Sequence, residues 1–367
     1  MNVLLTPGPA LTTWDVKQGL VVPDMCPRDA SFSQLLQSVR SELEQLAGGR
    51  AQCTCVLVPG SGTTAIESVI SSVVRPGGRI VVVHNGVYAQ RMVDIACKHG
   101  IEVDSVSFDP GHDVDMARVA TAMGAPGVEL VVVVHLETST GQLNPIAEIG
   151  RMAQSLGRRM MVDAMSSFGA VSIDMVRDGI DFLVTSSNKC LQAMPGLGIV
   201  LARPSTLESV DPSWSRSYSL DLVAQARFQN QSGQFRFTPP VQVLAALHVA
   251  LQELVREGVE SRGRRYTLRG DVVAQAMERL GLQPLLPQRC RSAWIQAWTL
   301  PSEGWPDYRR LYDDLLTEGY TIYPGILTNC PTFRIATIGD LSHEQVQGFV
   351  EAFDRVWTRQ RGAPHID

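Results

Sequence analysis

Short apolar runs recur along the first two hundred residues of the chain, and polar residues or glycines separate them. Seven of these runs have the length and composition of buried strands, at residues 53–58, 79–84, 102–108, 128–136, 159–163, 182–187 and 198–202. Segments with a helical repeat of apolar positions lie between several of them, for example 88–99 and 145–156. Near-continuous apolar strands are typical of parallel sheets covered on both faces. The pattern therefore predicts an α/β fold with a mostly parallel, seven-stranded sheet.

The pattern changes near residue 241. Long amphipathic segments at 241–257 and 264–280 precede short strand candidates at 293–299 and 332–335, and a last helical segment covers 342–358. This order is typical of an α+β unit. We therefore predict a large domain of residues 15–250 and a smaller domain of residues 251–367. We expect the N-terminal segment 1–14 to belong to the smaller domain.

The composition of the chain limits the kinds of molecule that the protein can bind. The 367 residues are 44% hydrophobic and 19% charged, as in soluble enzymes, and the net charge of −5 offers no basic surface for nucleic acid or an anionic membrane. The longest apolar run, residues 130–134, is too short to cross a bilayer, and the N-terminus lacks the pattern of a signal peptide. The spacing of Cys53 and Cys55 does not fit a zinc site. We expect a cytoplasmic protein with free thiols and no metal.

Polar side chains with catalytic potential follow three of the predicted strands. The segment Pro59-Gly60-Ser61-Gly62-Thr63-Thr64 joins a strand to a helix that we expect Thr64 and Glu67 to cap, and glycines before a helix N-terminus suit a phosphate. Asp163 ends a second strand, and Lys189 follows a third. A buried lysine has a lowered pKa, which makes its amine a nucleophile. Taken singly, each feature could equally be a turn, a helix cap or an exposed lysine.

Together these features match the needs of one cofactor. Pyridoxal phosphate requires an anion site, an acidic partner for its pyridine nitrogen and a lysine for a Schiff base. A fourth segment, His-Leu-Glu-Thr-Ser-Thr-Gly at 135–141, supplies an imidazole, a carboxylate and hydroxyls at the same edge of the sheet. We therefore predict a pyridoxal phosphate site there.

The motifs also resemble a known family, the class V pyridoxal-phosphate aminotransferases of fold type I. The resemblance rests on Gly-Ser-Gly-Thr at 60–63, residues 135–141, Val-Asp-Ala-Met-Ser-Ser-Phe-Gly at 162–169 and Ser-Asn-Lys-Cys at 187–190. Further matches at 5–9, 85–88, 235–240, 323–325 and 333–335 extend it over nearly the whole chain. Within the family, the chain is most similar to members that transfer the amino group of 2-aminoethylphosphonate to pyruvate in a ping-pong cycle.

The resemblance implies a role for each matching residue. Lys189 would form the Schiff base and shuttle a proton, and Asp163 would pair with the pyridinium nitrogen. The remaining cofactor-binding residues would be Ser61, Gly62, Thr63, Tyr88, Thr140, Asn188 and Thr238. Of these, Tyr88 would stack on the ring, Thr140 would lie near its oxygen, and Thr238 would reach the cofactor phosphate of the other subunit in a homodimer.

Substrate binding is assigned to two arginines. By resemblance, Arg334 would grip the acid group of the substrate, a bidentate task that suits guanidinium. The phosphonate lies one methylene further from the amine-bearing carbon than the carboxylate of alanine does. A pocket that binds both substrates would therefore benefit from a second cationic side chain. Our hypothesis is that Arg28, with residues 6–9, helps to hold the phosphonate. The alternative is a surface pair between Arg28 and Asp29.

Other functions remain open from the sequence. The general motifs also fit transaminases that act on alanine or serine with glyoxylate, or on phosphonoalanine. A desulfurase-type lyase on this fold would need a nucleophilic thiol, for which Cys330 is the candidate. A binding module that has lost catalysis could have discarded Lys189 or Asp163, yet both are present.

Overall fold

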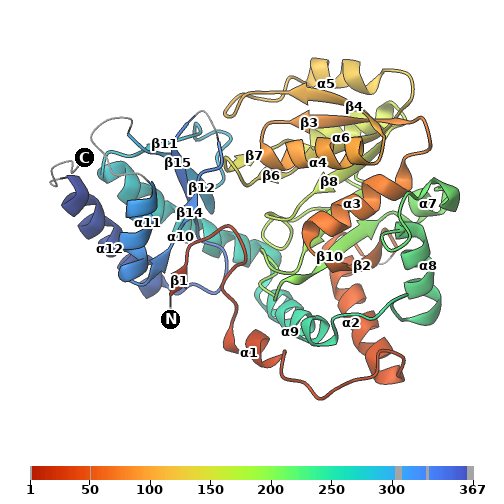
Figure 1. Ribbon diagram of the computed structural model, residues 1–367, viewed down its shortest axis with the longest axis horizontal. Helices are drawn as coiled ribbons and strands as arrows, with labels where there is room; N and C mark the ends of the chain where they lie inside the picture. Colours follow the sequence, from red (N-terminus) through yellow and green to blue (C-terminus); the bar gives the residue numbers. More distant parts are fainter. Residues whose placement is uncertain (1, 50, 302–307, 328–329, 362–367) are drawn as a thin grey trace.

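A seven-stranded sheet forms the larger of two lobes in the computed structural model, which describes residues 2–49, 51–301, 308–327 and 330–361 (Figure 1). Its strands lie in the order β2 (Thr54–Gly60), β10 (Gly196–Ala202), β9 (Phe182–Ser186), β8 (Arg159–Asp163), β5 (Val128–Val134), β3 (Arg79–His84) and β4 (Glu102–Ser107). All neighbours are parallel except β10, which is antiparallel to both β2 and β9. The predicted mostly parallel sheet is confirmed.

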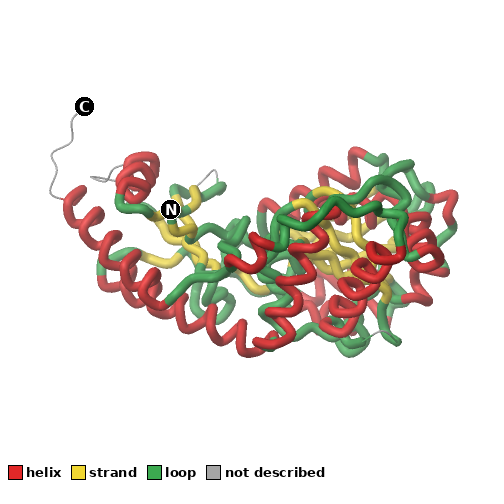
Figure 2. Tube along the Cα trace, turned by 90° about the horizontal axis from the view of Figure 1, so that it is seen from below, coloured by secondary structure: helices red, strands yellow, loops and turns green. Residues whose placement is uncertain are grey.

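Helices cover both faces of this sheet, as Figure 2 shows. One face packs against α2 (Ala30–Leu46), α5 (Met116–Met123), α6 (Ile146–Ser155) and α9 (Val241–Glu257), and the other against α3 (Gly62–Val73), α4 (Val87–Lys98) and α8 (Leu222–Ser232). Within β3, Val81 and Val83 belong to the first core and Ile80 and Val82 to the second. This alternation explains why the inner strands of the sheet are almost entirely apolar.

The smaller lobe is α+β, as expected. Its four-stranded sheet has the order β11 (Gln283–Pro284), β12 (Ile295–Thr299), β15 (Thr332–Ala336) and β14 (Tyr323–Pro324). The helices α10 (Val259–Arg279), α11 (Tyr308–Thr317) and α12 (His343–Arg361) accompany it, and α10 begins five residues before the predicted helix. Its core includes Leu5 from the N-terminal segment. The domain boundary at residue 250 stays a prediction.

The remaining elements are short: β1 (Val3–Leu4), α1 (Trp14–Gln18), β6 (Leu136–Glu137), β7 (Gln142–Leu143), α7 (Pro204–Glu208), a 3₁₀ turn (Pro212–Trp214) and β13 (Tyr320–Thr321). Within the described residues, no helix is both long and apolar enough to cross a membrane.

The N-terminal segment contacts both lobes. The amide of Leu5 donates to the carbonyl of Thr321 in the smaller lobe at 2.8 Å. Five residues later, the amide of Ala10 donates to the carbonyl of Asn188 in the larger lobe at 3.0 Å. The residues between these two anchors therefore pass beside Lys189.

Candidate active site

A cavity of about 190 Å³ lies at the end of the large sheet where several parallel strands finish. Its walls come from the β2–α3 turn, α4, β6 and the segments after β8 and β9. The lining residues are Ser61, Gly62, Thr63, Ile66, Tyr88, Arg91, Leu136, Thr138, Asp163, Met165, Ser166, Ser186, Asn188 and Lys189. Seven of the predicted site residues therefore meet in one place. Ligand sites in open α/β sheets occupy this edge.

The β2–α3 turn provides a site for an anion. Ser61 is the N-cap of α3, and its side chain and that of Thr64 form a reciprocal capping box. The predicted box between Thr64 and Glu67 is wrong, because the N-cap is Ser61, three residues before Thr64. A Cβ atom on Gly62 would lie only 1.9 Å from Sδ of Met165, so a side chain there would displace Met165, which lines the cavity. The backbone at the helix N-terminus is thus open to a ligand phosphate.

Arg91 adds a cation that the sequence analysis missed. Its Nη1 donates to Oγ1 of Thr63 at 3.1 Å, and its Cζ lies 4.8 Å from the centroid of the Tyr88 ring. The three-residue spacing of Tyr88 and Arg91 on a predicted helix is the pattern that could have indicated this pair. The guanidinium therefore lies at the end of the cavity that the β2–α3 turn forms.

Two titratable groups in the cavity have strongly shifted pKa values. Burial raises the pKa of Asp163 to about 6, although the amide of Met165 donates to its carboxylate at 2.9 Å and lowers it. Loss of water contact lowers the pKa of Lys189 to about 8, against the opposing effect of Asp163. The lysine Nζ donates to the carbonyl of Pro7 at 2.7 Å. Paired shifts of this kind in one cavity are typical of active sites.

Arg334 enters from the smaller lobe, on strand β15. Its Nε donates to the carbonyl of Pro324 at 2.9 Å, and its Nη1 to the carbonyl of Thr138, a cavity residue, at 3.1 Å. The guanidinium carbon lies 5.5 Å from the centroid of the Tyr323 ring. Its positive charge contributes to the lowered pKa of Lys189. Arg334 thus lies beside the cavity, although it does not line it.

Besides Arg334, three more predicted residues lie outside the cavity within this chain. The hydroxyl of Thr140 hydrogen-bonds to its own turn, with the carbonyl of Glu137 at 3.4 Å, and Thr138 lines the cavity instead. Thr238 is exposed. Arg28 is also exposed, and its Nη1 donates to Gln234 and to the carbonyl of Phe235 at 2.9 and 2.8 Å. Their roles toward the cofactor and the substrate stay predictions.

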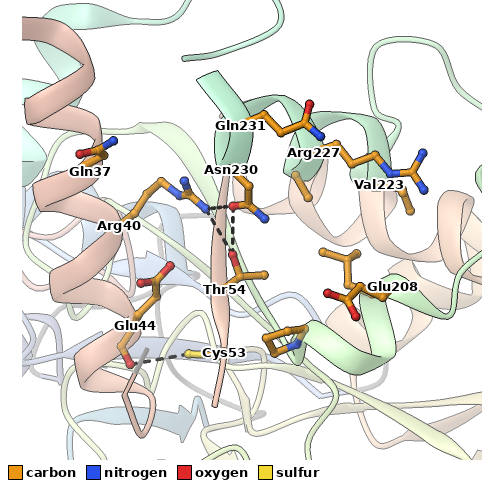
Figure 3. A pocket seen from close by; sticks show the side chains of 13 residues that line it. Gln37, Arg40, Glu44, Cys53, Thr54, Glu208, Val223, Arg227, Asn230 and Gln231 are labelled. Carbon is orange, nitrogen blue, oxygen red and sulfur yellow. Dashed lines mark hydrogen bonds between the residues drawn. The ribbon is translucent and has the colours of Figure 1, made fainter. Parts of the chain in front are cut away.

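A larger hollow of about 590 Å³ lies along the edge strand β2 and shares no lining residue with the cavity around Lys189 (Figure 3). Here Arg40 donates to the carbonyl of Cys55 at 2.7 Å, and Gln229 pairs with the backbone of Leu57 at 3.1 and 2.7 Å. These side chains form hydrogen bonds with backbone groups of the edge strand that could otherwise pair with another strand. Edge protection therefore accounts for Arg40 in this hollow, while Gln229 lies outside its lining.

The cavity fits pyridoxal phosphate. The glycine-rich turn with Arg91 suits its phosphate, the buried carboxylate of Asp163 suits its ring nitrogen, and Lys189 suits its aldehyde. Because residue 62 is glycine, its backbone has no side chain between it and the cavity, and the thioether of Met165 packs against it. Cys330, the thiol required by the lyase alternative, is half-buried and does not line the cavity.

Comparisons with known proteins agree with this geometry. Residues 16–283 match the aminotransferase class-V family. A 2-aminoethylphosphonate–pyruvate transaminase of Syntrophobacter fumaroxidans is 40% identical over 95% of both chains, and one of Phocaeicola vulgatus is 38% identical over 96% of this chain and 98% of its own. The solved structure of ureidoglycine–glyoxylate aminotransferase from Bacillus subtilis superposes with a TM-score of 0.91 at 21% identity, covering 100% of this chain and 95% of the other.

The family match spans well over half of the chain, and the similarity to the two transaminases is nearly full-length. The resemblance inferred from the motifs is therefore confirmed, and the chain belongs to the class V aminotransferase family.

Proposed function

We propose that this protein transfers the amino group of 2-aminoethylphosphonate to pyruvate, giving phosphonoacetaldehyde and alanine in a ping-pong cycle. The observation that carries the proposal is the position of Lys189, whose pKa is lowered to about 8, in one cavity with Asp163 and beside Arg334. The near full-length similarity to transaminases of that name supports the choice of substrates.

Three groups of residues would hold the cofactor. Ser61, Gly62 and Thr63 would bind the phosphate, together with Arg91, and Asn188 would contribute at the lysine turn. Tyr88 would pack on one face of the ring. Pyridoxal phosphate, when bound, supplies an aldehyde that accepts amino groups and a ring that withdraws electrons from the substrate carbon.

Asp163 would keep the ring nitrogen protonated. Its side chain is 4% exposed, and its pKa is about 6 in the cofactor-free protein. The carboxylate is therefore more basic than that of an ordinary aspartate and can accept a hydrogen bond from a protonated ring nitrogen. A positive charge on the ring nitrogen would favour the carboxylate form of Asp163, because opposite charges attract strongly when water is excluded.

Lys189 would move the proton at the substrate carbon. With a pKa of about 8, roughly a quarter of the amine is neutral at pH 7.5, against about 0.1% for an ordinary lysine. The neutral amine can accept a proton, and the ammonium can return it. The hydroxyls of Thr138, Ser166 and Ser186 line the same cavity and provide polar contacts that do not compete for that proton.

Arg334 would bind the acid group of the substrate. In alanine the carboxylate is bonded directly to the amine-bearing carbon, whereas in 2-aminoethylphosphonate one methylene intervenes. A second group that holds the phosphonate would accommodate this difference, and we assign that role to Arg28 with residues 6–9. An unchanged KM for the phosphonate in Arg28→Met would exclude Arg28.

The experiment that tests the reaction is a half-reaction followed by absorbance. Holoenzyme is mixed separately with 2-aminoethylphosphonate, phosphonoalanine, alanine, serine and cysteine. We expect 2-aminoethylphosphonate and alanine to bleach the yellow cofactor, the first most efficiently. Preferential bleaching by serine or phosphonoalanine would identify another class V transaminase, and sulfide release from cysteine would identify a lyase.

We also propose a cytoplasmic homodimer in which Thr238 and Arg28 act at the site of the other subunit. Both side chains are exposed in the single chain and lie close together, since Arg28 hydrogen-bonds to residues 234–235. Mixing the inactive variants Lys189→Ala and Thr238→Ala, with exchange of subunits, should restore one intact site per mixed dimer. Failure of mixed dimers to regain activity would contradict this arrangement.

A further inference from the structure

An ionic cluster around one buried arginine lies behind the turn that carries Lys189. Arg262 on α10 is only 1% exposed, and its Nη1 donates to the carbonyl of Cys190, the residue after Lys189, at 3.1 Å. Its Nε donates to the carboxylate of Glu257 at 2.8 Å. Arg262 does not line the cofactor cavity, so no role assigned so far explains it.

The same carboxylate also binds Arg265. The Nε and Nη2 atoms of Arg265 donate to the two oxygens of Glu257 at 2.5 and 2.8 Å. Its remaining Nη1 donates to the carbonyl of Gly339 at 3.1 Å. Gly339 lies three residues after strand β15, which carries Arg334. One carboxylate thus connects the lysine turn of the large lobe to the end of the strand that holds Arg334.

The surroundings of the cluster keep it rigid. Cys190, Tyr266, Ala336 and Ile338 belong to one small apolar core between the lobes. Gly263 of α10 approaches the carbonyl of Ala170 so closely that a Cβ atom would lie 2.3 Å from that oxygen. Burial opposes the charge of Glu257, but hydrogen bonds from Arg265 and Arg262 outweigh it and lower its pKa. Glu257 and Arg265 are 24% and 27% exposed, but Arg262 is enclosed by packed side chains and therefore has few alternative arrangements.

We propose that Arg262 is a positioning residue for Lys189, and that Glu257 and Arg265 fix the lysine turn relative to the strand that holds Arg334. The inference rests on the proposed function only for the roles of Lys189 and Arg334. The cluster would hold the amine in its dry position and set its separation from the guanidinium that binds the substrate acid group.

The alternative is a purely structural ion pair between the lobes. Loss of stability alone cannot distinguish the two, because breaking any buried ion pair destabilises a protein. Arg40 offers a matched control. It too is a buried arginine that donates to backbone carbonyls, those of Cys55 and Gln229, but it lies in the hollow along β2 (Figure 3).

The test compares Arg262→Met with Arg40→Met. The chain contains three lysines, Lys17, Lys98 and Lys189, so NMR of cofactor-free protein with 13C-labelled lysine gives three side-chain signals. The signal that is absent from the Lys189→Ala variant belongs to Lys189. In Arg262→Met we expect the titration midpoint of Lys189 to rise from about 8 by at least one pH unit, because water reaches the loosened turn. In Arg40→Met the midpoint should not move.

Kinetics provide the second readout. Arg262→Met should lower kcat and raise KM for the amino donor, each by about tenfold or more, whereas Arg40→Met should alter neither. Arg262→Lys keeps a charge beside Glu257 and should recover part of both losses. If Arg262→Met does not fold, Glu257→Gln replaces it, with the same expected direction of change.

Equal loss of stability in both methionine variants, with an unchanged Lys189 midpoint in both, would overturn the proposal. Failure of the proposed function is a separate result. It would appear as wild-type holoenzyme that does not respond to 2-aminoethylphosphonate, whatever the NMR titration shows.

Discussion

Replacing Lys189 with methionine should stabilise the cofactor-free protein at neutral pH while abolishing turnover. The lysine pKa falls from 10.5 to about 8 on folding, because the side chain loses water. Each pKa unit corresponds to about 1.4 kcal/mol, so holding the charged amine in this site at pH 7 costs on the order of 3 kcal/mol. Methionine removes this cost. It also removes the hydrogen bond from Nζ to the carbonyl of Pro7, which stabilises the wild type by about 1–2 kcal/mol.

The sign of the pH dependence follows from the direction of the shift. Between about pH 8 and pH 10.5 the unfolded chain binds the proton of Lys189 more tightly than the folded chain does, so wild-type stability rises with pH across this window. The cost of about 3 kcal/mol at pH 7 falls to about 1 kcal/mol at pH 10. The advantage of the methionine variant should therefore shrink by about 2 kcal/mol, and its net stabilisation at pH 7 should be about 1–2 kcal/mol.

The assay is urea unfolding of cofactor-free wild type and Lys189→Met at pH 7 and pH 10. Other titrating groups are common to both proteins and cancel in the difference. Lys98→Met, at an exposed helical position, is the control and should show no such pH-dependent difference. A Lys189→Met variant whose difference from wild type is the same at both pH values would refute the claim that this amine is held in a dry site.

Three further substitutions test the cavity. Asp163→Asn should lower kcat by roughly 100-fold or more in a steady-state assay, because a neutral amide cannot hold the ring nitrogen protonated. Gly62→Ala should weaken cofactor binding in an equilibrium titration, since its Cβ would lie 1.9 Å from Sδ of Met165; Gly124→Ala, whose Cβ would approach no atom closer than 3.4 Å, should not. Arg91→Met should raise the cofactor dissociation constant by about 10- to 100-fold, as expected for a lost charged hydrogen bond, and unaltered binding would exclude Arg91 from the phosphate site.

The strands were predictable because burial on both faces leaves a continuous apolar run. The inner strands of the sheet lie where such runs occur, whereas the edge strand β4 is mostly polar and has a single buried residue. The polar residues that follow the strands identified the cavity. Helix α8 was not predicted, and its sequence Leu-Val-Ala-Gln-Ala-Arg-Phe-Gln-Asn-Gln-Ser shows why. Gln225 and Gln229 are buried there to hydrogen-bond the backbone of Leu57, so polar residues occupy its inner face. Because these buried positions are polar, the segment lacks the apolar repeat from which a helix can be predicted.

The site residues that were not predicted from the sequence were missed for a different reason. Thr138 rather than Thr140 lines the cavity, because the hydroxyl of Thr140 donates to the carbonyl of Glu137 within its own turn, and the sequence does not specify that turn. The contact of Arg262 with Cys190 joins residues 72 positions apart, and the chain between them gives no local indication of it. Sequence reasoning therefore identified the chemistry of the cavity, while the side chains that position it depend on tertiary packing.

The central claim is that the amine of Lys189, with Asp163 and Arg334, serves an amino transfer from 2-aminoethylphosphonate. The most direct test follows the absorbance of stoichiometric holoenzyme during one cycle. Addition of 2-aminoethylphosphonate should bleach the yellow colour with release of one equivalent of phosphonoacetaldehyde per site, and addition of pyruvate should restore it with formation of one equivalent of alanine. Holoenzyme that stays yellow with 2-aminoethylphosphonate but bleaches with another amino donor would contradict the account.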